Sequence, residues 1–334
     1  MKTKIALTLL IVFAFSVAIA NTNNKSGFDI VALGTQGGVN THDLSAFLIS
    51  PHSQPVSVAC DAGSLTTGIN SAIEAGSLSH SLLPENYPYS LLGFVLKEHI
   101  KGYLISHAHL DHVAGLIIGS VDDTKKPIYG LSSTINALKR DYFNWKVWPN
   151  FASSGINPAL NKYTYVELQP YKNLPLLDMP MSVKAFPLSH NGIESTAFVL
   201  KYQSDIVVCL GDTGPDSVEK SDKLEALWKY IKPYAEAKQL KAIIIESSFP
   251  NSRPDNLLFG HLTPNYVIEE LSVLADLMKD PNKLIGLPVI ISHIKPSLRK
   301  GNNVKVIIEQ ELKANNSLKV NFIIPTQGES WHFK

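Results

Sequence analysis

Four side chains that commonly bind metal ions lie within six consecutive residues of this 334-residue chain. They are His107, His109, Asp111 and His112. The apolar residues 102–105 before them predict a strand, and residues 113–118 predict a helix that packs behind it. Four ligands at a strand-to-helix turn cannot all face one side, so the spacing predicts two adjacent metal sites. The two histidines of the extended segment converge on one site, and the Asp-His pair at the start of the helix belongs to the other.

Three further residues with metal-binding side chains each follow an apolar stretch that is predicted to be a strand. They are His190, Asp212 and His293. α/β folds assemble their sites from residues at strand ends, because the sheet brings distant segments together. Each of the three alone could be an ordinary loop residue, but with the cluster at 107–112 they complete a two-metal site.

This pattern resembles that of the metallo-β-lactamase superfamily, in which a His-x-His-x-Asp-His run is followed by a His, an Asp and a His at later strand ends. Residues 107–120 are similar, more narrowly, to the signature of the class II 3′,5′-cyclic-nucleotide phosphodiesterases. The segments that support this resemblance are 34–38, 60–63, 246–249 and 260–264. Val121 departs from the family, which usually has Ala or Pro there, but this position packs and does not bind metal.

The resemblance implies how the seven residues divide between two divalent cations. One metal is held by His107, His109 and His190, the other by Asp111, His112 and His293, and Asp212 bridges both. A ligand set of imidazoles and carboxylates without thiolate suits zinc, although manganese or iron could occupy the same set.

The resemblance also implies hydrolysis of cyclic AMP, with cyclic GMP as a further candidate, to the nucleoside 5′-monophosphate. Two divalent cations, two carboxylates and a bridging hydroxide give a net charge of about +1, which attracts a phosphodiester. The hydroxide attacks in line and the 3′ oxygen leaves. The candidate catalytic residues are Asp111 and His261. His261 could protonate the leaving oxygen or hold the phosphate near a helix N-terminus, or it could be only a residue of the capping loop.

The segments that must position these residues alternate between short β-branched runs and amphipathic stretches. Strands are predicted at residues 28–35, 44–49, 56–61, 102–106, 183–189, 197–202, 205–211, 242–247, 288–293 and 320–325. Helices are predicted after Ser64, His112, Ser132, Asp216, Thr263 and Asn302. In the helix near 263, Thr263 can act as the cap and Pro264 fits the first turn. Early hairpins followed by alternating strands and helices predict an αββα sandwich of two mixed sheets, in a single domain over residues 21–334.

Residues 140–178 are rich in aromatic side chains, Pro, Asn and Ser, and predict a long insertion outside the core. The aromatic residues are Tyr142, Phe143, Trp145, Trp148, Phe151, Tyr163, Tyr165 and Tyr171. Such an insertion could cap the ligand, and one of its rings could recognise the base. Among the remaining histidines, His42 is expected near the rim of the site. The others are predicted to be surface or packing residues without partners at ligand spacing: His52, His80, His99 and His332.

Residues 1–20 predict a cleaved secretory signal peptide, because Lys2 and Lys4 precede an apolar run that ends in Ala18-Ile19-Ala20. The alternative is a membrane anchor, for which an apolar run of about 15 residues is short. We therefore expect a periplasmic or secreted protein without stable membrane association. Removal of the signal peptide takes away Lys2 and Lys4, which leaves 28 basic and 29 acidic residues and a net charge of −1. A nearly neutral protein gives no reason to expect a nucleic-acid partner. The oligomeric state stays open, a homodimer included.

The chain has two cysteines, Cys60 and Cys209. Export makes a disulfide between them possible, but both lie in apolar runs, where we expect small buried thiols. Two other functions compete with a cyclic-nucleotide phosphodiesterase. One is another hydrolase of the same scaffold, acting on a thioester, a lactam or an RNA 3′ end. The other is a protein that binds metal or nucleotide without catalysis, although a site with every expected ligand is more than binding requires.

Overall fold

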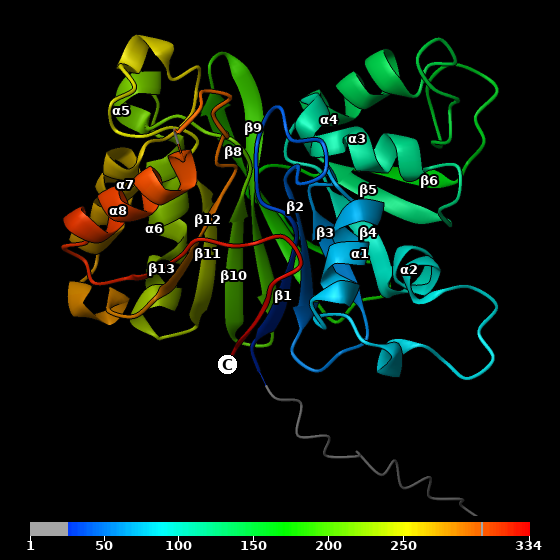
Figure 1. Cartoon of the computed structure of the whole chain (residues 1–334), viewed down its shortest axis with the longest axis horizontal. Coiled ribbons are helices and arrows are strands. Elements are labelled where there is room, and N and C mark those ends of the chain that lie inside the picture. Colours follow the sequence, from blue (N-terminus) through cyan, green and yellow to red (C-terminus); the bar gives the residue numbers. More distant parts are fainter. Residues whose placement is uncertain (1–25, 302) are drawn as a thin grey trace, which may run out of the picture.

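The computed structural model describes residues 26–301 and 303–334. These residues form two seven-stranded sheets packed face to face, with helices on both outer sides (Figure 1). The predicted αββα sandwich of two mixed sheets is confirmed. The predicted signal peptide at residues 1–20 lies outside the described residues.

The two sheets each combine strands from distant parts of the sequence. The first sheet has the order β14 (Ser330–Phe333), β1 (Phe28–Gly34), β2 (Ala46–Pro51), β3 (Ser57–Cys60), β4 (Ile100–Leu104), β5 (Lys126–Gly130) and β6 (Tyr163–Glu167). The second has the order β13 (Asn321–Ile323), β12 (Pro288–Ser292), β11 (Leu240–Glu246), β10 (Asp205–Leu210), β9 (Ile193–Tyr202), β8 (Ser182–His190) and β7 (Asn173–Pro175). Every strand predicted from the sequence is present.

Strand direction places the candidate site residues at the carboxyl ends of the strands, on one side of each sheet. β3 and β4 are parallel neighbours in the first sheet. In the second sheet β10, β11 and β12 are parallel, and β8 runs the same way because β9 is antiparallel to both β8 and β10. The carboxyl ends of β8, β10 and β12 therefore lie on the same side of the sheet. A predicted metal ligand lies at or just beyond each of these ends.

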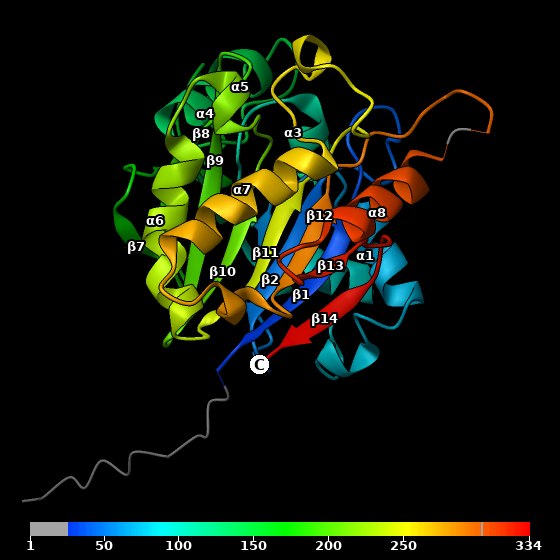
Figure 2. The ribbon, with the colours of Figure 1, turned by 90° about the vertical axis from the view of Figure 1, so that its left-hand side faces the viewer.

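The helices cover the outer faces of the sandwich. Those of the amino-terminal half are α1 (Thr66–Glu74), α2 (Leu91–Phe94), α3 (Leu110–Gly119) and α4 (Ser132–Ala137). Those of the carboxyl-terminal half are α5 (Asp216–Glu219), α6 (Lys223–Glu236), α7 (Pro264–Leu277) and α8 (Val304–Asn315). Figure 2 shows α6, α7 and α8 across the second sheet, where they share one apolar core with it. A separate apolar layer fills the space between the sheets.

Helix α7 illustrates how the sequence pattern produces this packing. Val267, Leu271 and Leu274 recur at helical spacing and are all fully buried against the second sheet. Pro264 occupies the first turn, where its missing N–H costs nothing. Thr263 is the N-cap residue as predicted, but its side chain makes no capping hydrogen bond.

The expectation of two free buried thiols is wrong. Cys60 of β3 and Cys209 of β10 form a disulfide that joins the two sheets, with Cα atoms 6.8 Å apart. Both residues lie in apolar runs because they belong to the layer between the sheets. The apolar context therefore indicated burial correctly, but it carried no information about which strands face each other.

Residues 140–178 contribute to both sheets, although the sequence predicts an insertion outside the core. β6 pairs with β5 at the edge of the first sheet, and β7 pairs with β8 at the edge of the second. Tyr163 of β6 is fully buried in the core beneath the amino-terminal helices. Within the described residues, no helix has both the length and the apolar character that a membrane span needs.

Candidate metal centre

All seven predicted ligands meet at the carboxyl ends of strands. From the first sheet come the four residues that follow β4, the last two of which lie in the first turn of α3. From the second sheet come His190, the last residue of β8, Asp212 just beyond β10, and His293 directly after β12. The site thus lies where the two sheets meet, and its residues are supplied by both.

The carboxylate of Asp212 lies in the middle of this cluster. Its Oδ2 is 3.2 Å from His293, 3.3 Å from His112, and 3.8 Å from both His107 and His190, measured to Nε2 in each case. His109 faces the same point through Nδ1, which is 3.4 Å from Nε2 of His190. On the other side, Asp111 Oδ2 is 3.2 Å from Nε2 of His293.

These side chains fall into two groups, each of which could hold one metal ion. His107, His109, His190 and Asp212 form one group, and Asp111, His112 and His293 form the other, with ligand atoms within 4.8 Å of one another. Nε2 of His107 and of His112 are buried and have no hydrogen-bond partner among the described residues. Buried polar atoms are rarely left unpaired, so a cation fits the donor set that points to this space.

Burial and mutual charge set the protonation of the cluster. Burial lowers the pKa of His107 well below its usual value and that of His190 to about 4, so both rings are neutral, the form that binds metal. Burial would raise the pKa of Asp212, but His112 and neighbouring histidines hold it well below its usual range. His112 differs from His107 and His190: burial would lower its pKa, but Asp212 and Asp61 raise it well above the usual value.

The ring nitrogens that face away from the centre are held by a second layer of hydrogen bonds. Nδ1 of His107 contacts Ser106 Oγ at 3.0 Å, Nδ1 of His112 contacts Asp61 Oδ2 at 2.7 Å, Nδ1 of His190 contacts the Gly260 carbonyl at 2.7 Å, and Nδ1 of His293 contacts Ser248 Oγ at 2.9 Å. Partners of this kind fix the tautomer and orientation of metal-binding rings. No role was predicted for Asp61, although a carboxylate directly after an apolar strand is the signal that identified Asp212.

Glu246, at the end of β11, is a second buried carboxylate for which no role was predicted. Its Oε1 accepts hydrogen bonds from His261 Nδ1 at 2.8 Å and from Thr213 N at 3.0 Å, and its Oε2 accepts one from Ser248 Oγ at 2.6 Å. Burial would lower the pKa of His261, but Glu246 raises it above the usual value. The ring of His261 stacks on that of His293 with centroids 5.2 Å apart, so the predicted catalytic histidine lies within the cluster.

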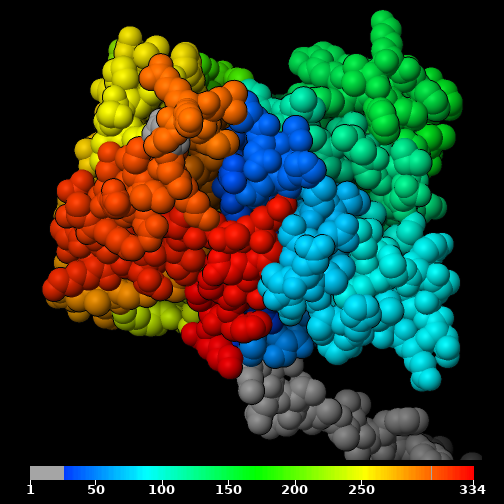
Figure 3. Space-filling model, viewed as in Figure 1, coloured from blue at the N-terminus to red at the C-terminus, as the bar shows by residue number. Residues whose placement is uncertain are grey.

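The loop after β1 closes the site from the side of the first sheet. The backbone N–H of Gly38 donates a 3.0 Å hydrogen bond to Asp111 Oδ2. Gly37 packs so closely that a Cβ atom there would lie 2.2 Å from Cε1 of His293. The carboxylate of Asp43 anchors the loop by accepting hydrogen bonds from its first residues. In Figure 3 this loop forms the blue surface between the helices of the two halves.

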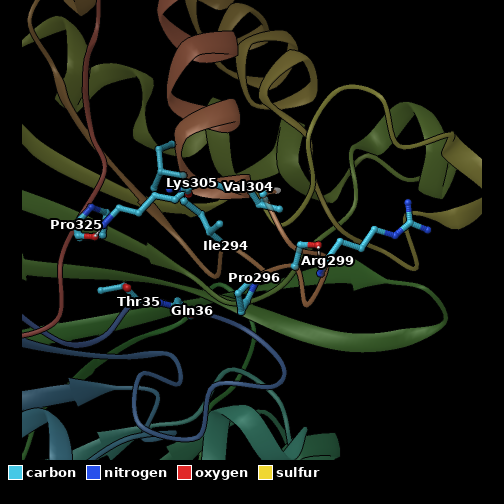
Figure 4. Close-up of a pocket in the computed structure, with 12 residues that line it drawn as sticks. Thr35, Gln36, Ile294, Pro296, Arg299, Val304, Lys305 and Pro325 are labelled. Atoms are coloured by element: carbon cyan, nitrogen blue, oxygen red, sulfur yellow. Dashed lines mark hydrogen bonds between the residues drawn. The ribbon is translucent and has the colours of Figure 1, made fainter.

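Two hollows adjoin the loop. A groove of about 710 Å³ beside Asp111 runs between α3 and the start of α1, and its lining includes Gly38, Ser64, Thr67, Leu110, Ala114 and Ile118. A pocket of about 460 Å³ lies where the loop meets β12 and the start of α8, with Thr35 and Gln36 on one side and Val304 and Lys305 on the other (Figure 4). Among the residues that the structure describes, no aromatic side chain lines the groove beside Asp111.

Two aromatic side chains from the segment 140–178 contact the scaffold of the site. Tyr142 donates a 2.8 Å hydrogen bond to the carbonyl of Ala108, between the first two histidines. Trp148 Nε1 donates to Ser120 Oγ at the end of α3. Tyr142 therefore supports the turn that carries the predicted ligands, whereas Trp148 holds the far end of α3.

The remaining histidines differ from expectation at two positions. His42 and His80 are exposed, and His99 is buried, with Ser57 Oγ 2.7 Å from its Nε2. The prediction that none has a partner at ligand spacing is wrong for His52 and His332, which meet at the carboxylate of Asp29. That contact depends on β14, a strand that the sequence analysis did not predict.

Comparison with known proteins places the chain in a family. The family model for class-II cAMP phosphodiesterases matches residues 25–328. A protein from Aliivibrio fischeri named 3′,5′-cyclic-nucleotide phosphodiesterase is 48% identical over 99% of both chains. The crystal structure of unliganded yeast PDE1 is 26% identical, with a TM-score of 0.81 over 92% of this chain and all of that one.

The fold has a wider distribution than the family. The metallo-β-lactamase fold protein YhfI from Bacillus subtilis is 18% identical and superimposes with a TM-score of 0.59 over 92% of this chain and all of that one. This likeness concerns the sandwich alone, whereas the family match spans nearly the whole chain, including every residue of the metal centre. The chain therefore belongs to the class II cyclic-nucleotide phosphodiesterases, built on a metallo-β-lactamase fold.

Proposed function

We propose that this protein hydrolyses cyclic AMP to 5′-AMP at a two-metal centre, with cyclic GMP as a second candidate substrate. The observation that carries the proposal is the convergence of six other predicted ligands around Asp212, with two buried Nε2 atoms that have no hydrogen-bond partner among the described residues. The name of the Aliivibrio fischeri relative supports the substrate class. We therefore favour a cyclic phosphodiester as the substrate over a lactam, a thioester or an RNA 3′ end.

The ligand groups define where two cations would bind. His107, His109 and His190 would hold one, Asp111, His112 and His293 the other, and Asp212 would contact both. We propose zinc, because imidazole and carboxylate donors without thiolate suit it. When bound, the two ions supply Lewis acidity and a hydroxide nucleophile at neutral pH.

The chain's own contribution to bond cleavage is a proton at His261. Loss of the 3′ oxygen creates an alkoxide that needs a proton, and a positioned histidine is the commonest donor. His261 is held by Glu246 through Nδ1, which leaves Nε2 as the atom that would carry the proton to the leaving oxygen. Asp111 is held by the Gly38 N–H, so its carboxylate keeps a fixed orientation beside the reacting phosphate.

The nucleoside would lie in the groove beside Asp111. Leu110 and Ile118 are 63% and 66% exposed at its wall, an arrangement that leaves apolar surface for a purine to cover. Thr66 and Thr67 offer hydroxyl groups at the start of α1. This aliphatic groove replaces the aromatic wall that the sequence suggested for base recognition.

We also propose that the protein acts in the periplasm or outside the cell, as one domain over residues 21–334. Residues 1–20 support export by their composition, and the Cys60–Cys209 disulfide is typical of an oxidising compartment. After cleavage of the signal peptide we expect no stable association with membrane and no nucleic-acid partner.

The deciding experiment incubates the purified mature protein with cyclic AMP, with and without a chelator, and identifies the product by chromatography. We expect 5′-AMP, no product after chelation, and recovery when Zn²⁺ is restored. Unchanged cyclic AMP with fully metal-loaded protein would refute the activity, and 3′-AMP would refute the bond assignment. Asp212→Ala should lose both metal and turnover, whereas the exposed Asp276→Ala should keep both.

A further inference from the structure

Three more side chains of metal-binding type converge at the amino end of β1, whereas the metal centre lies beyond its carboxyl end. Asp29 lies in β1, and His332 of β14 is its direct cross-strand partner. On the other side Asp29 pairs with Ser50 of β2, and His52 follows β2 directly. Side chains of cross-strand partners lie on the same face of a sheet, so the register places one carboxylate between two imidazoles.

The two rings face the same oxygen. Asp29 Oδ1 is 2.7 Å from Nδ1 of His52 and 2.8 Å from Nδ1 of His332. One ligand atom from each residue lies within 4.8 Å of the others. Zinc ligands at about 2.0–2.2 Å from the ion lie roughly 3.3 Å apart in a tetrahedral set, so a small rotation of the rings admits an ion.

We propose that Asp29, His52 and His332 form a second, separate binding site for a divalent transition-metal ion such as Zn²⁺. Two imidazoles and one carboxylate are a donor set that such ions prefer. The His52 and Asp29 side chains are 10% and 22% exposed, which holds them in place, while the 64% exposed His332 leaves the remaining coordination position to water. A bound ion ties β14, at the edge of the first sheet, to β1 and to the turn after β2.

The experiment measures zinc per chain after dialysis against buffered Zn²⁺, in the wild type and in variants. We expect His332→Ala to bind one equivalent fewer than the wild type, while His80→Ala, which removes an exposed histidine from the His80–Leu82 turn, binds as many. The difference in bound zinc between these proteins does not depend on how much zinc occupies the metal centre around Asp212, because none of the substitutions touches that centre. Hydrolysis of cyclic AMP should be equal in all three proteins, because the cluster lies at the other end of β1.

Two further variants separate metal binding from a purely hydrogen-bonded cluster. Asp29→Asn and His52→Gln conserve the size of the side chains, and each should lose the same equivalent as His332→Ala. Equal zinc in the wild type and His332→Ala would overturn the proposal, since hydrogen bonds alone would then account for the cluster. Loss in His332→Ala with full retention in both other variants would overturn it as well.

Discussion

Asp61 orients the ring of His112, a candidate metal ligand, from the side opposite the candidate metal centre. Its Oδ2 accepts a 2.7 Å hydrogen bond from Nδ1 of His112, and the same carboxylate accepts two more from Ser106. We expect Asp61→Asn to lower metal affinity and kcat/KM by about 10- to 100-fold. Asn tolerates the positive φ of 54° at this position, so the backbone should be preserved. Chelator competition and steady-state kinetics test this, with Asp276→Asn as the control; unchanged metal affinity would contradict it.

His261→Gln isolates the proposed proton donor. We expect kcat for cyclic AMP to fall by about 10²- to 10⁴-fold while metal content stays the same. The loss should shrink for a phosphodiester with a 4-nitrophenolate leaving group, because that group leaves without a proton. An equal loss for both substrates would exclude a role in leaving-group protonation, and loss of metal would show that His261 supports the ligands instead.

The residues that the sequence analysis identified and those it missed differ in a physical way. His190, Asp212 and His293 could be predicted because a metal-binding side chain after an apolar strand stands out in a linear sequence. Asp61 and Glu246 have the same position, but their roles depend on hydrogen bonds to rings from other loops. No spacing rule specifies such partners, so the supporting layer of the centre became visible only in the fold.

At the level of elements, the sequence predicts strands where apolar runs are long and misses those with weak patterns. β5 contains Lys126 and Pro127 and ends in glycine, and β7 and β14 are only three and four residues long. Their pairing comes from neighbouring strands and not from their own composition, which explains why they went unpredicted. Missing β14 also concealed the contact between Asp29 and His332.

His99 ends the segment that connects α2 to β4, and its buried side chain should make the stability of the fold depend on pH. Burial lowers the pKa of His99 from 6.5 to about 4, and the ring contacts Ser57 Oγ and the Pro55 carbonyl in the neutral form. Between these values the unfolded chain binds the proton and the folded one does not. The contribution to stability is therefore complete above pH 6.5 and is lost as the pH falls towards 4, by about 3 kcal/mol.

The His99→Gln variant tests this dependence, because glutamine keeps a donor and an acceptor but does not titrate. Urea unfolding of the wild type and the variant should be measured from pH 4 to pH 7. We expect the difference in unfolding free energy between the two proteins to shrink by about 3 kcal/mol towards pH 4. A difference that is constant over this range would show that His99 does not carry the proton linkage.

The wall of the groove that α3 forms should affect substrate binding without affecting chemistry. Ile118 is exposed and lines the groove about two helical turns beyond Asp111, so Ile118→Ser should raise KM for cyclic AMP by up to about tenfold with kcat unchanged. Val306→Ser on α8, also an exposed aliphatic residue, is the matched control. A change in kcat with constant KM would place the nucleoside elsewhere.

On the scale of the whole molecule, the candidate metal centre requires the two sheets to keep a fixed separation. Its candidate ligands come from both sheets, so a shift of one sheet relative to the other would separate Asp212 from the residues after β4. The apolar layer between the sheets supplies most of this cohesion. The sequence could predict the layers from alternating patterns, but the pairing of strands across the interface is a property of the assembled fold.

The Cys60–Cys209 disulfide adds a covalent link directly beneath the metal centre, since one cysteine precedes Asp61 and the other lies three residues before Asp212. It closes a loop with a sequence separation of 149 residues, so its removal should lower the free energy of unfolding by about 2–5 kcal/mol, mainly by freeing the unfolded chain. The strands themselves are held by the backbone hydrogen bonds of each sheet, and the double variant Cys60→Ala/Cys209→Ala should therefore keep its kcat at a temperature where it is folded.

Urea unfolding of the oxidised wild type, the reduced wild type and the double variant tests the contribution of the disulfide. The reduced wild type and the double variant should share a lower urea midpoint than the oxidised wild type. An unchanged urea midpoint would show that the apolar layer alone holds the two sheets together. A loss of kcat in the folded variant would show that the disulfide is needed for the geometry of the site.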